Sequence, residues 1–253
     1  MTASERLKEI TEQIEKLGTV QVKVLAKQYH VTEDLIRKDL RKLEKMGVAD
    51  RVYGGAERKK NKFQNASVPY RLESYSEEKA IIAKKALQLI NEMDYVYFDT
   101  SSTSYFTAIE LAKSGKQVTV ITDMLAIMKE LSEYTNIKMI GIGGDFDYYT
   151  GGFLGASSIS QIRSFHVDIA FISCKSIHLE KNALLEGFVE IGHQKKTILD
   201  IARIKVALLM HLKFRETGVF HFYDANHLDY IVTDTEVTDT ELKQIKDLKI
   251  KLV

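Results

Sequence analysis

Apolar residues recur every three or four positions through the first 46 residues, which is the spacing of helices that bury one face. The first of three helices is expected between Ser4, a suitable N-cap, and Gly18. The second ends near His30, and the third begins after Thr32 and stops at Gly47. The apolar stripes consist of Leu7, Ile10, Ile14 and Leu17 in the first helix, Val22, Val24, Leu25 and Tyr29 in the second, and Leu35, Ile36, Leu40, Leu43 and Met46 in the third.

An extended segment follows the third helix and reverses direction at two glycines. Residues 48–56 are predicted to be extended up to Gly54 and Gly55, which favour a tight turn. Three short helices followed by a hairpin are typical of a winged helix-turn-helix.

From Glu77 onward, short apolar runs alternate with helical stretches, as in βα units that build a largely parallel sheet. Strands are predicted at 95–98, 118–121, 138–142, 170–172, 206–209 and 230–233, and helices at 80–90, 107–113, 125–134 and 192–203. A polar segment with the only proline, Pro69, precedes them. We therefore predict an α/β protein with a winged helix-turn-helix at 1–57, a linker at 58–75 and an α/β domain at 76–253.

Charge is unevenly distributed, although 36 Lys and Arg nearly balance 35 Asp and Glu. The first 60 residues hold 14 basic and 10 acidic side chains, a net charge of +4, and the remainder carries −3. A small basic domain joined to a larger, mildly acidic one suggests that the small domain binds a polyanion and that the larger domain has a different function.

Several functional classes are disfavoured by what the sequence lacks. The single cysteine, Cys174, excludes an intramolecular disulfide and is expected to be a buried, inert thiol. The seven histidines show no metal-ligand spacing, and no nucleotide-binding glycine motif is present, so no metal or cofactor is expected. There is no run of 18 apolar residues and no signal-peptide pattern, so we expect a cytoplasmic protein without a membrane partner.

The third predicted helix carries a broad cationic face. Arg37, Arg41 and Lys45 are spaced by four, and Lys38 and Lys42 form an adjacent stripe opposite the apolar one. Taken alone, such charges are also typical of a solvent-exposed helix that binds no DNA. Together with the helix order and the wing, they favour a helix that enters the major groove of DNA.

Residues 31–40 and 51–56 resemble the DeoR family of bacterial transcriptional regulators. Lys38 stands for the second arginine of the family pattern and Leu35 for its threonine, and the arginine–x–x–glycine–glycine–alanine wing begins at Arg51. By resemblance, the helix-turn-helix spans about Val20 to Asp39. The implied contacts with double-stranded operator DNA are Thr32, Glu33, Leu35, Arg37, Lys38, Arg41, Lys42, Arg51, Tyr53, Gly54 and Gly55.

The resemblance covers nearly the whole chain and implies an effector domain similar to ribose-5-phosphate isomerase folds. Such domains bind a phosphorylated sugar or a related small anion, and the polar loop at residues 99–104 suits a phosphate at the carboxyl end of a strand. The implied effector-binding residues are Asp99, Thr100, Ser101, Ser102, Thr103, Thr122, Gly143, Gly144, Lys175, Glu190, Lys195 and Lys213.

Departures from the family pattern cluster at these ligand loops. Ser101 replaces a glycine, Asp123 an asparagine and Gln194 a lysine, with Lys195 one position later. The segments 173–176 and 210–214 lack the family's aspartates. We therefore expect an altered or weakened effector site, and the missing carboxylate at 173–176 argues against isomerase chemistry.

The leading hypothesis is a non-enzymatic transcriptional regulator, more plausibly a repressor, of sugar or carbohydrate metabolism genes. It is expected to form a homo-oligomer, a dimer or tetramer, because paired recognition helices read paired half-sites. Two alternatives remain: a DNA-binding oligomer with a degenerate effector domain, and a sugar-phosphate isomerase-like enzyme.

Overall fold

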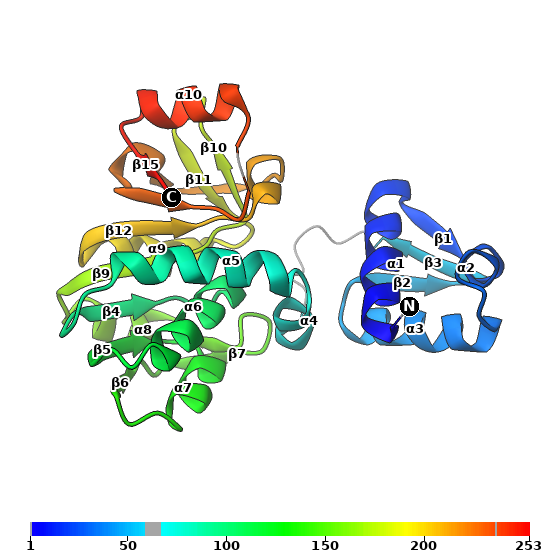
Figure 1. Cartoon of the computed structure of the whole chain (residues 1–253), viewed down its shortest axis with the longest axis horizontal. Coiled ribbons are helices and arrows are strands. Elements are labelled where there is room, and N and C mark those ends of the chain that lie inside the picture. Colours follow the sequence, from blue (N-terminus) through cyan, green and yellow to red (C-terminus); the bar gives the residue numbers. More distant parts are fainter. Residues whose placement is uncertain (1, 59–66, 236) are drawn as a thin grey trace. The chain divides into compact units, whose positions relative to one another are not determined.

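The computed structural model describes residues 2–58, 67–235 and 237–253 and divides into two units, Met1–Ser74 and Tyr75–Val253 (Figure 1). In the first unit, α1 (Ala3–Leu17), α2 (Val22–Tyr29) and α3 (Glu33–Lys45) accompany a three-stranded antiparallel sheet. Its strands are β1 (Thr19–Gln21), β2 (Ala49–Val52) and β3 (Gly55–Arg58), in the order β1-β3-β2. This arrangement confirms the predicted winged helix-turn-helix.

Local capping defines the helix boundaries of this unit. Thr2, not Ser4, is the N-cap of α1, and it forms a capping box with Glu5. Thr32 caps α3 as predicted, since its hydroxyl accepts a hydrogen bond from the Leu35 amide at 3.3 Å. The sequence placed the first cap two residues late because serine is the more strongly favoured N-cap, and only the capping box with Glu5 selects Thr2.

The core of the first unit forms where the three helices meet the sheet. Its fully buried side chains include Ile10, Ile14, Leu25, Ile36, Leu40 and Leu43. Gly55 is required at the wing because a Cβ there would overlap the Val20 carbonyl oxygen of strand β1. The glycine pair therefore allows β3 to lie between β1 and β2.

Part of the predicted linker is helical. Residues 59–66 lie outside the described residues, but Val68–Glu73 form helix α4. The Ser67 amide donates to the Met46 carbonyl at 3.1 Å, and Tyr70 packs against the core of the first unit. Helix α4 therefore belongs to the first unit.

The second unit is built on a seven-stranded parallel sheet in the order β15-β14-β12-β9-β4-β5-β6. The strands are β4 (Tyr95–Phe98), β5 (Val118–Thr122), β6 (Ile137–Gly141), β9 (Val167–Ile172), β12 (Ala202–Leu208), β14 (Tyr230–Val232) and β15 (Lys251–Leu252). All six predicted strands are present, and the strand at 95–98 has the predicted bounds.

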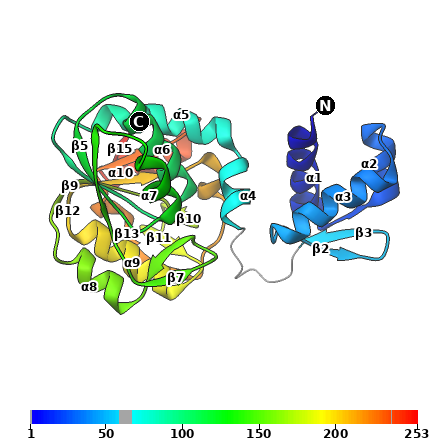
Figure 2. The same cartoon turned by 90° about the horizontal axis from the view of Figure 1, so that it is seen from below.

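Helices cover both faces of this sheet (Figure 2). Helices α5 (Ser76–Ala86), α6 (Ser102–Lys113) and α7 (Leu125–Leu131) lie together, and α8 (Ala156–Ile162) and α9 (Val189–Asp200) lie against the opposite face. The strand order reverses between β4 and β9, because the chain first builds outward through β5 and β6 and then returns to β9. In parallel α/β sheets, ligands bind at the carboxyl ends of the strands at such a point.

Two antiparallel additions complete the second unit. β7 (Asp145–Asp147) and β8 (Gly152–Leu154) form a hairpin, and β10 (Ser176–His178), β11 (Ala183–Glu186) and β13 (Phe220–Asp224) form a small sheet. The remaining elements are α10 (Asp239–Asp247) and the short 3-10 helices η1 (Leu87–Leu89), η2 (His211–Phe214) and η3 (Ala225–His227). The sequence did not predict the antiparallel strands, because they are only three to five residues long and most contain polar residues.

Several predicted helix bounds were wrong by three to five residues, among them the start of α6 and the end of α9. Helix α6 begins at Ser102, five residues before its predicted start, because the Ser101 side chain caps it. Helix α9 ends at Asp200, and Arg203 already belongs to β12. Both shifts follow from local caps and strand pairing that apolar spacing does not report.

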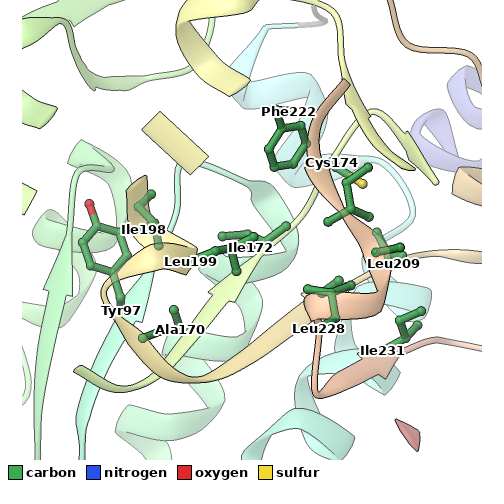
Figure 3. Close-up of a cluster of buried hydrophobic side chains, with 14 of the residues drawn as sticks. Tyr97, Ala170, Ile172, Cys174, Ile198, Leu199, Leu209, Phe222, Leu228 and Ile231 are labelled. Carbon is green, nitrogen blue, oxygen red and sulfur yellow. The ribbon is translucent and has the colours of Figure 1, made fainter. Parts of the chain in front are cut away.

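The large core lies between the sheet and its covering elements (Figure 3). It includes Cys174, as predicted, and burial raises the pKa of this thiol to about 12, so it is protonated and unreactive at neutral pH. In the described part of the chain, none of the helices is long and apolar enough to cross a membrane.

A buried ion pair joins α1 to α3 and gives a stability prediction. Arg6 Nε lies 2.6 Å from Asp39 Oδ2, and both side chains are less than 10% exposed. Arg6→Ala should lower the free energy of unfolding of the first unit by about 3 kcal/mol, because it leaves a buried carboxylate unpaired. Urea denaturation followed by circular dichroism measures this change.

Arg37→Ala is the matched control, since its ion pairs are exposed and should contribute less than about 1 kcal/mol. Equal losses for the two variants would contradict a structural role for the Arg6–Asp39 pair.

Candidate DNA-binding surface and effector site

Helix α3 separates its charged and apolar residues onto two faces. Ile36, Leu40 and Leu43 are buried in the core of the first unit. The exposed face carries the five predicted cations, Arg37, Lys38, Arg41, Lys42 and Lys45. The cationic surface predicted from the sequence is therefore present and exposed.

Several of these cations already have partners within the first unit. Arg37 forms ion pairs with Glu33 at 2.6 Å and Asp34 at 2.8 Å in the first turn of α3. Lys42 lies 3.4 Å from Glu73 of helix α4. Among the described residues, Lys38 has no ion-pair partner, so it is available to a phosphate without breaking a contact.

The wing presents an aromatic side chain at its tip. Tyr53 is fully exposed between β2 and β3, and Gly54 adopts a positive φ of 79° that completes the turn. Arg51 remains half-exposed, 4.0 Å from Glu44 of α3. Arg51, Tyr53 and Gly54 therefore lie on the surface as predicted. Gly55 is buried, because it packs against the Val20 carbonyl of β1, so its predicted exposure to DNA was wrong.

Asp99 occupies the point where the strand order of the sheet reverses. Its Oδ1 accepts hydrogen bonds from the Ser104 hydroxyl at 2.6 Å and the Ser101 amide at 3.1 Å. Its Oδ2 accepts from the Ser173 amide at 3.0 Å, directly after strand β9. One buried carboxylate thus ties the loop after β4 to the end of β9.

Lys195 reaches the same carboxylate from helix α9. Its Nζ lies 3.3 Å from Asp99 Oδ2 and 2.7 Å from Glu186 Oε1, and it donates to the Ser173 carbonyl at 2.5 Å. Burial disfavours the charged amine, but Glu186 and Asp99 outweigh burial and raise the pKa of Lys195 above its ordinary value. Lys195 is therefore a buried cation rather than a solvated lysine.

A second buried pair adjoins this cluster. Gln194 Nε2 donates to Asp123 Oδ2 at 2.5 Å and to the Phe153 carbonyl at 2.7 Å. Burial raises the pKa of Asp123 to about 7, and the neighbouring Asp99 charge adds to this, although the Gln194 hydrogen bond opposes it. The positions that depart from the family pattern at 123 and 194 thus contact each other.

The remaining predicted effector residues fall into three places. Thr100, Ser101, Ser102 and Thr103 are buried at the start of α6, Thr122 is buried before Asp123, and Gly143 and Gly144 follow β6 beside Ser158. Lys175 and Lys213 instead meet at Glu216, each at 3.1 Å. Glu190 is exposed in the first turn of α9. The structure therefore places the loop residues at the carboxyl ends of β4, β5 and β6, whereas Lys175 and Lys213 pair with Glu216.

Four residues of the cluster were neither among the predicted effector-binding residues nor in the polar loop at 99–104: Asp123, Ser173, Glu186 and Gln194. Two of them, Asp123 and Gln194, were visible as departures, but their contact joins residues 71 positions apart. The structure also corrects one argument: segment 173–176 lacks a carboxylate, yet Asp99 and Glu186 supply two at this edge. The missing aspartate is therefore not evidence against an isomerase.

A winged helix-turn-helix joined to a parallel α/β unit with a polar cluster at its switch point defines a two-domain DNA-binding regulator. A sequence model of the DeoR-like helix-turn-helix domain matches residues 6–62, and one of the DeoR C terminal sensor domain matches residues 74–235. The chain belongs to the DeoR family.

Named relatives match along almost the full chain. The "Lactose phosphotransferase system repressor" of Streptococcus mutans is 29% identical, with 99% of each chain covered. The "HTH-type transcriptional repressor GlcR" of Bacillus subtilis is 28% identical over 92% of this chain and 89% of its own. A solved structure of eIF2B delta from Chaetomium thermophilum has a TM-score of 0.49 and 14% identity, with 66% of this chain and 59% of that chain covered.

The raised pKa of Asp123 predicts how stability depends on pH. As pH rises from about 4 to about 7, the unfolded carboxyl ionises while the buried one stays protonated, so the wild-type free energy of unfolding should fall. Asp123→Asn removes this ionisation. The variant should melt above the wild type at pH 7.5, and the difference should shrink toward pH 4.

Asp200→Asn, at a half-exposed carboxylate of the same unit, is the control and should follow the wild-type pH profile. Parallel wild-type and Asp123→Asn profiles from pH 4 to 8 would show that Asp123 ionises normally.

Proposed function

We propose that the chain is a sequence-specific transcriptional repressor of carbohydrate genes that acts as a homo-oligomer and responds to a phosphorylated sugar. The exposed cationic face of α3 next to the wing carries this proposal. Its width and charge suit the major groove of operator DNA, with Tyr53 at an adjacent groove or backbone. The names of the relatives, two of them repressors, support the direction of control.

The sensing step is proposed for the carboxyl edge of the parallel sheet. The amino end of α6 supplies backbone N–H groups and the hydroxyls of the 100–103 loop, which suit a phosphate. The effector would shift the population between DNA-competent and DNA-incompetent arrangements by as much as its affinity differs between them. A homo-oligomer would place two α3 helices on paired half-sites.

One observation favours a second candidate, a DNA-binding oligomer that senses nothing. Asp99, Glu186 and Lys195 satisfy one another in a buried network, as in a purely structural core. Because Lys195 holds both the Asp99 and the Glu186 carboxylate in ion pairs, neither is free to act as a general base, so we propose no enzymatic activity.

Lys38→Gln tests the DNA-binding face. Removing one phosphate contact should weaken binding to the protein's own promoter fragment and lower the slope of log affinity against log salt by about 0.9. Fluorescence anisotropy across a salt series measures both. Lys129→Gln, an exposed lysine of α7, should leave affinity and slope unchanged. An unchanged slope for Lys38→Gln would place this face away from DNA.

A melting-temperature series tests sensing. Glucose 6-phosphate, galactose 6-phosphate, fructose 6-phosphate and ribose 5-phosphate are compared at millimolar concentration with the unphosphorylated sugars. A true effector at 100 times its dissociation constant should stabilise the folded protein by about 2.7 kcal/mol. Equal melting temperatures throughout would favour the non-sensing alternative.

A further inference from the structure

The Asp123–Gln194 pair leaves two buried hydrogen-bond acceptors unused. Asp123 and Gln194 are only 1% and 2% exposed, yet Asp123 Oδ1 and Gln194 Oε1 form no hydrogen bond with any residue that the structure describes. The buried Tyr97 hydroxyl also has no hydrogen-bond partner among those residues, and burial together with the Asp123 charge raises the pKa of Tyr97. Leaving buried polar atoms unsatisfied costs about 1–3 kcal/mol each, so such atoms call for an explanation.

The charges around Asp123 and Gln194 determine which kind of ligand group could bind their unused acceptors. Asp99, Asp123 and Glu186 provide three carboxyl groups, and Lys195 is the cation that contacts this cluster in the described part of the chain. Lys175 and Lys213 are engaged by Glu216. A phosphate at this inner end would meet acceptors and negative charge, whereas a hydroxyl or ammonium group would meet the acceptors it needs.

The β7–β8 hairpin covers the pair. The Phe153 amide donates to the Asp123 carbonyl at 2.9 Å, and the Phe153 carbonyl accepts from Gln194. A Cβ on Gly152 would overlap Thr100 and the Asp123 carbonyl, so the hairpin backbone rests directly on the site. Gly144 and Gly155, both at positive φ, lie at the two ends of the hairpin.

We propose that Asp123 and Gln194 determine effector specificity by accepting hydrogen bonds from a hydroxyl or ammonium group at the end of the effector remote from its phosphate. This assignment rests on the proposed sensing function. The hairpin must lift to admit the ligand, whose phosphate then faces the start of α6. The donor group of the ligand donates to Asp123 Oδ1 and Gln194 Oε1, the two acceptors that Phe153 leaves unused.

Asp123→Asn separates the two ends of the ligand. The asparagine amide can donate to Gln194 Oε1, which closes the acceptor pair within the protein. Isothermal titration calorimetry compares inorganic phosphate with the four sugar phosphates named above. The sugar phosphate that the wild type binds most tightly should lose roughly tenfold in affinity for the variant, while inorganic phosphate binds both proteins equally. Asp200→Asn is the control and should change neither affinity.

A second variant, Gln194→Lys, should change the affinity for inorganic phosphate as well as the affinity for the sugar phosphate. Gln194→Lys adds a cation and removes an acceptor, so inorganic phosphate should bind more tightly and the advantage of the sugar phosphate should shrink. Glucosamine 6-phosphate and 2-deoxyglucose 6-phosphate, compared with glucose 6-phosphate, then distinguish an ammonium donor from a hydroxyl donor.

The outcomes separate the two levels of the proposal. If the wild type binds neither phosphate nor any sugar phosphate, the proposed sensing function fails and this assignment fails with it. If the wild type binds a sugar phosphate and Asp123→Asn retains the full affinity, sensing stands but the pair does not read the ligand. In that case a buried water satisfies the unused acceptors.

Discussion

The second unit depends on the Asp99 carboxylate, which lies where the strand order of the parallel sheet reverses. Asp99 accepts hydrogen bonds from the start of α6 and from the end of β9, and Lys195 of α9 compensates its charge. Two halves of a doubly wound sheet meet here, and their loops would otherwise leave backbone N–H groups unpaired at a buried edge. The same interaction therefore closes the fold and shapes the candidate effector site.

The first unit solves a different problem, which is to hold a highly charged helix firmly enough to read a duplex. Helix α3 buries one apolar face and also buries Asp39 against Arg6 of α1, so its orientation is fixed from two sides. Its outer face remains cationic, although Glu33, Asp34 and Glu73 already engage two of the cations. In the proposed complex with DNA, these cations would exchange their acidic partners for phosphates.

The effector site combines two kinds of environment in a small space. Around Lys195 the Asp99 and Glu186 carboxylates share one cation, and a buried charged group that is paired in this way favours one rigid arrangement. Around Asp123 the polar atoms are only half satisfied, and a neighbouring glycine-flanked hairpin is the element that would have to move. The paired groups around Lys195 would thus keep the fold, while the half-satisfied groups around Asp123 would determine which effector the site binds.

The sequence alone determined the local features: the three helices and wing of the first unit, the strands of the parallel sheet, and the cationic face of α3. Apolar periodicity, caps and glycines act over a few residues, so they are readable along the chain. It could not determine that Lys195 is buried, that Gln194 meets Asp123, or that Lys175 and Lys213 share Glu216. Those facts depend on contacts between distant segments, because strand order and the crossing of α9 over the sheet decide which side chains meet. Burial then sets their charge states.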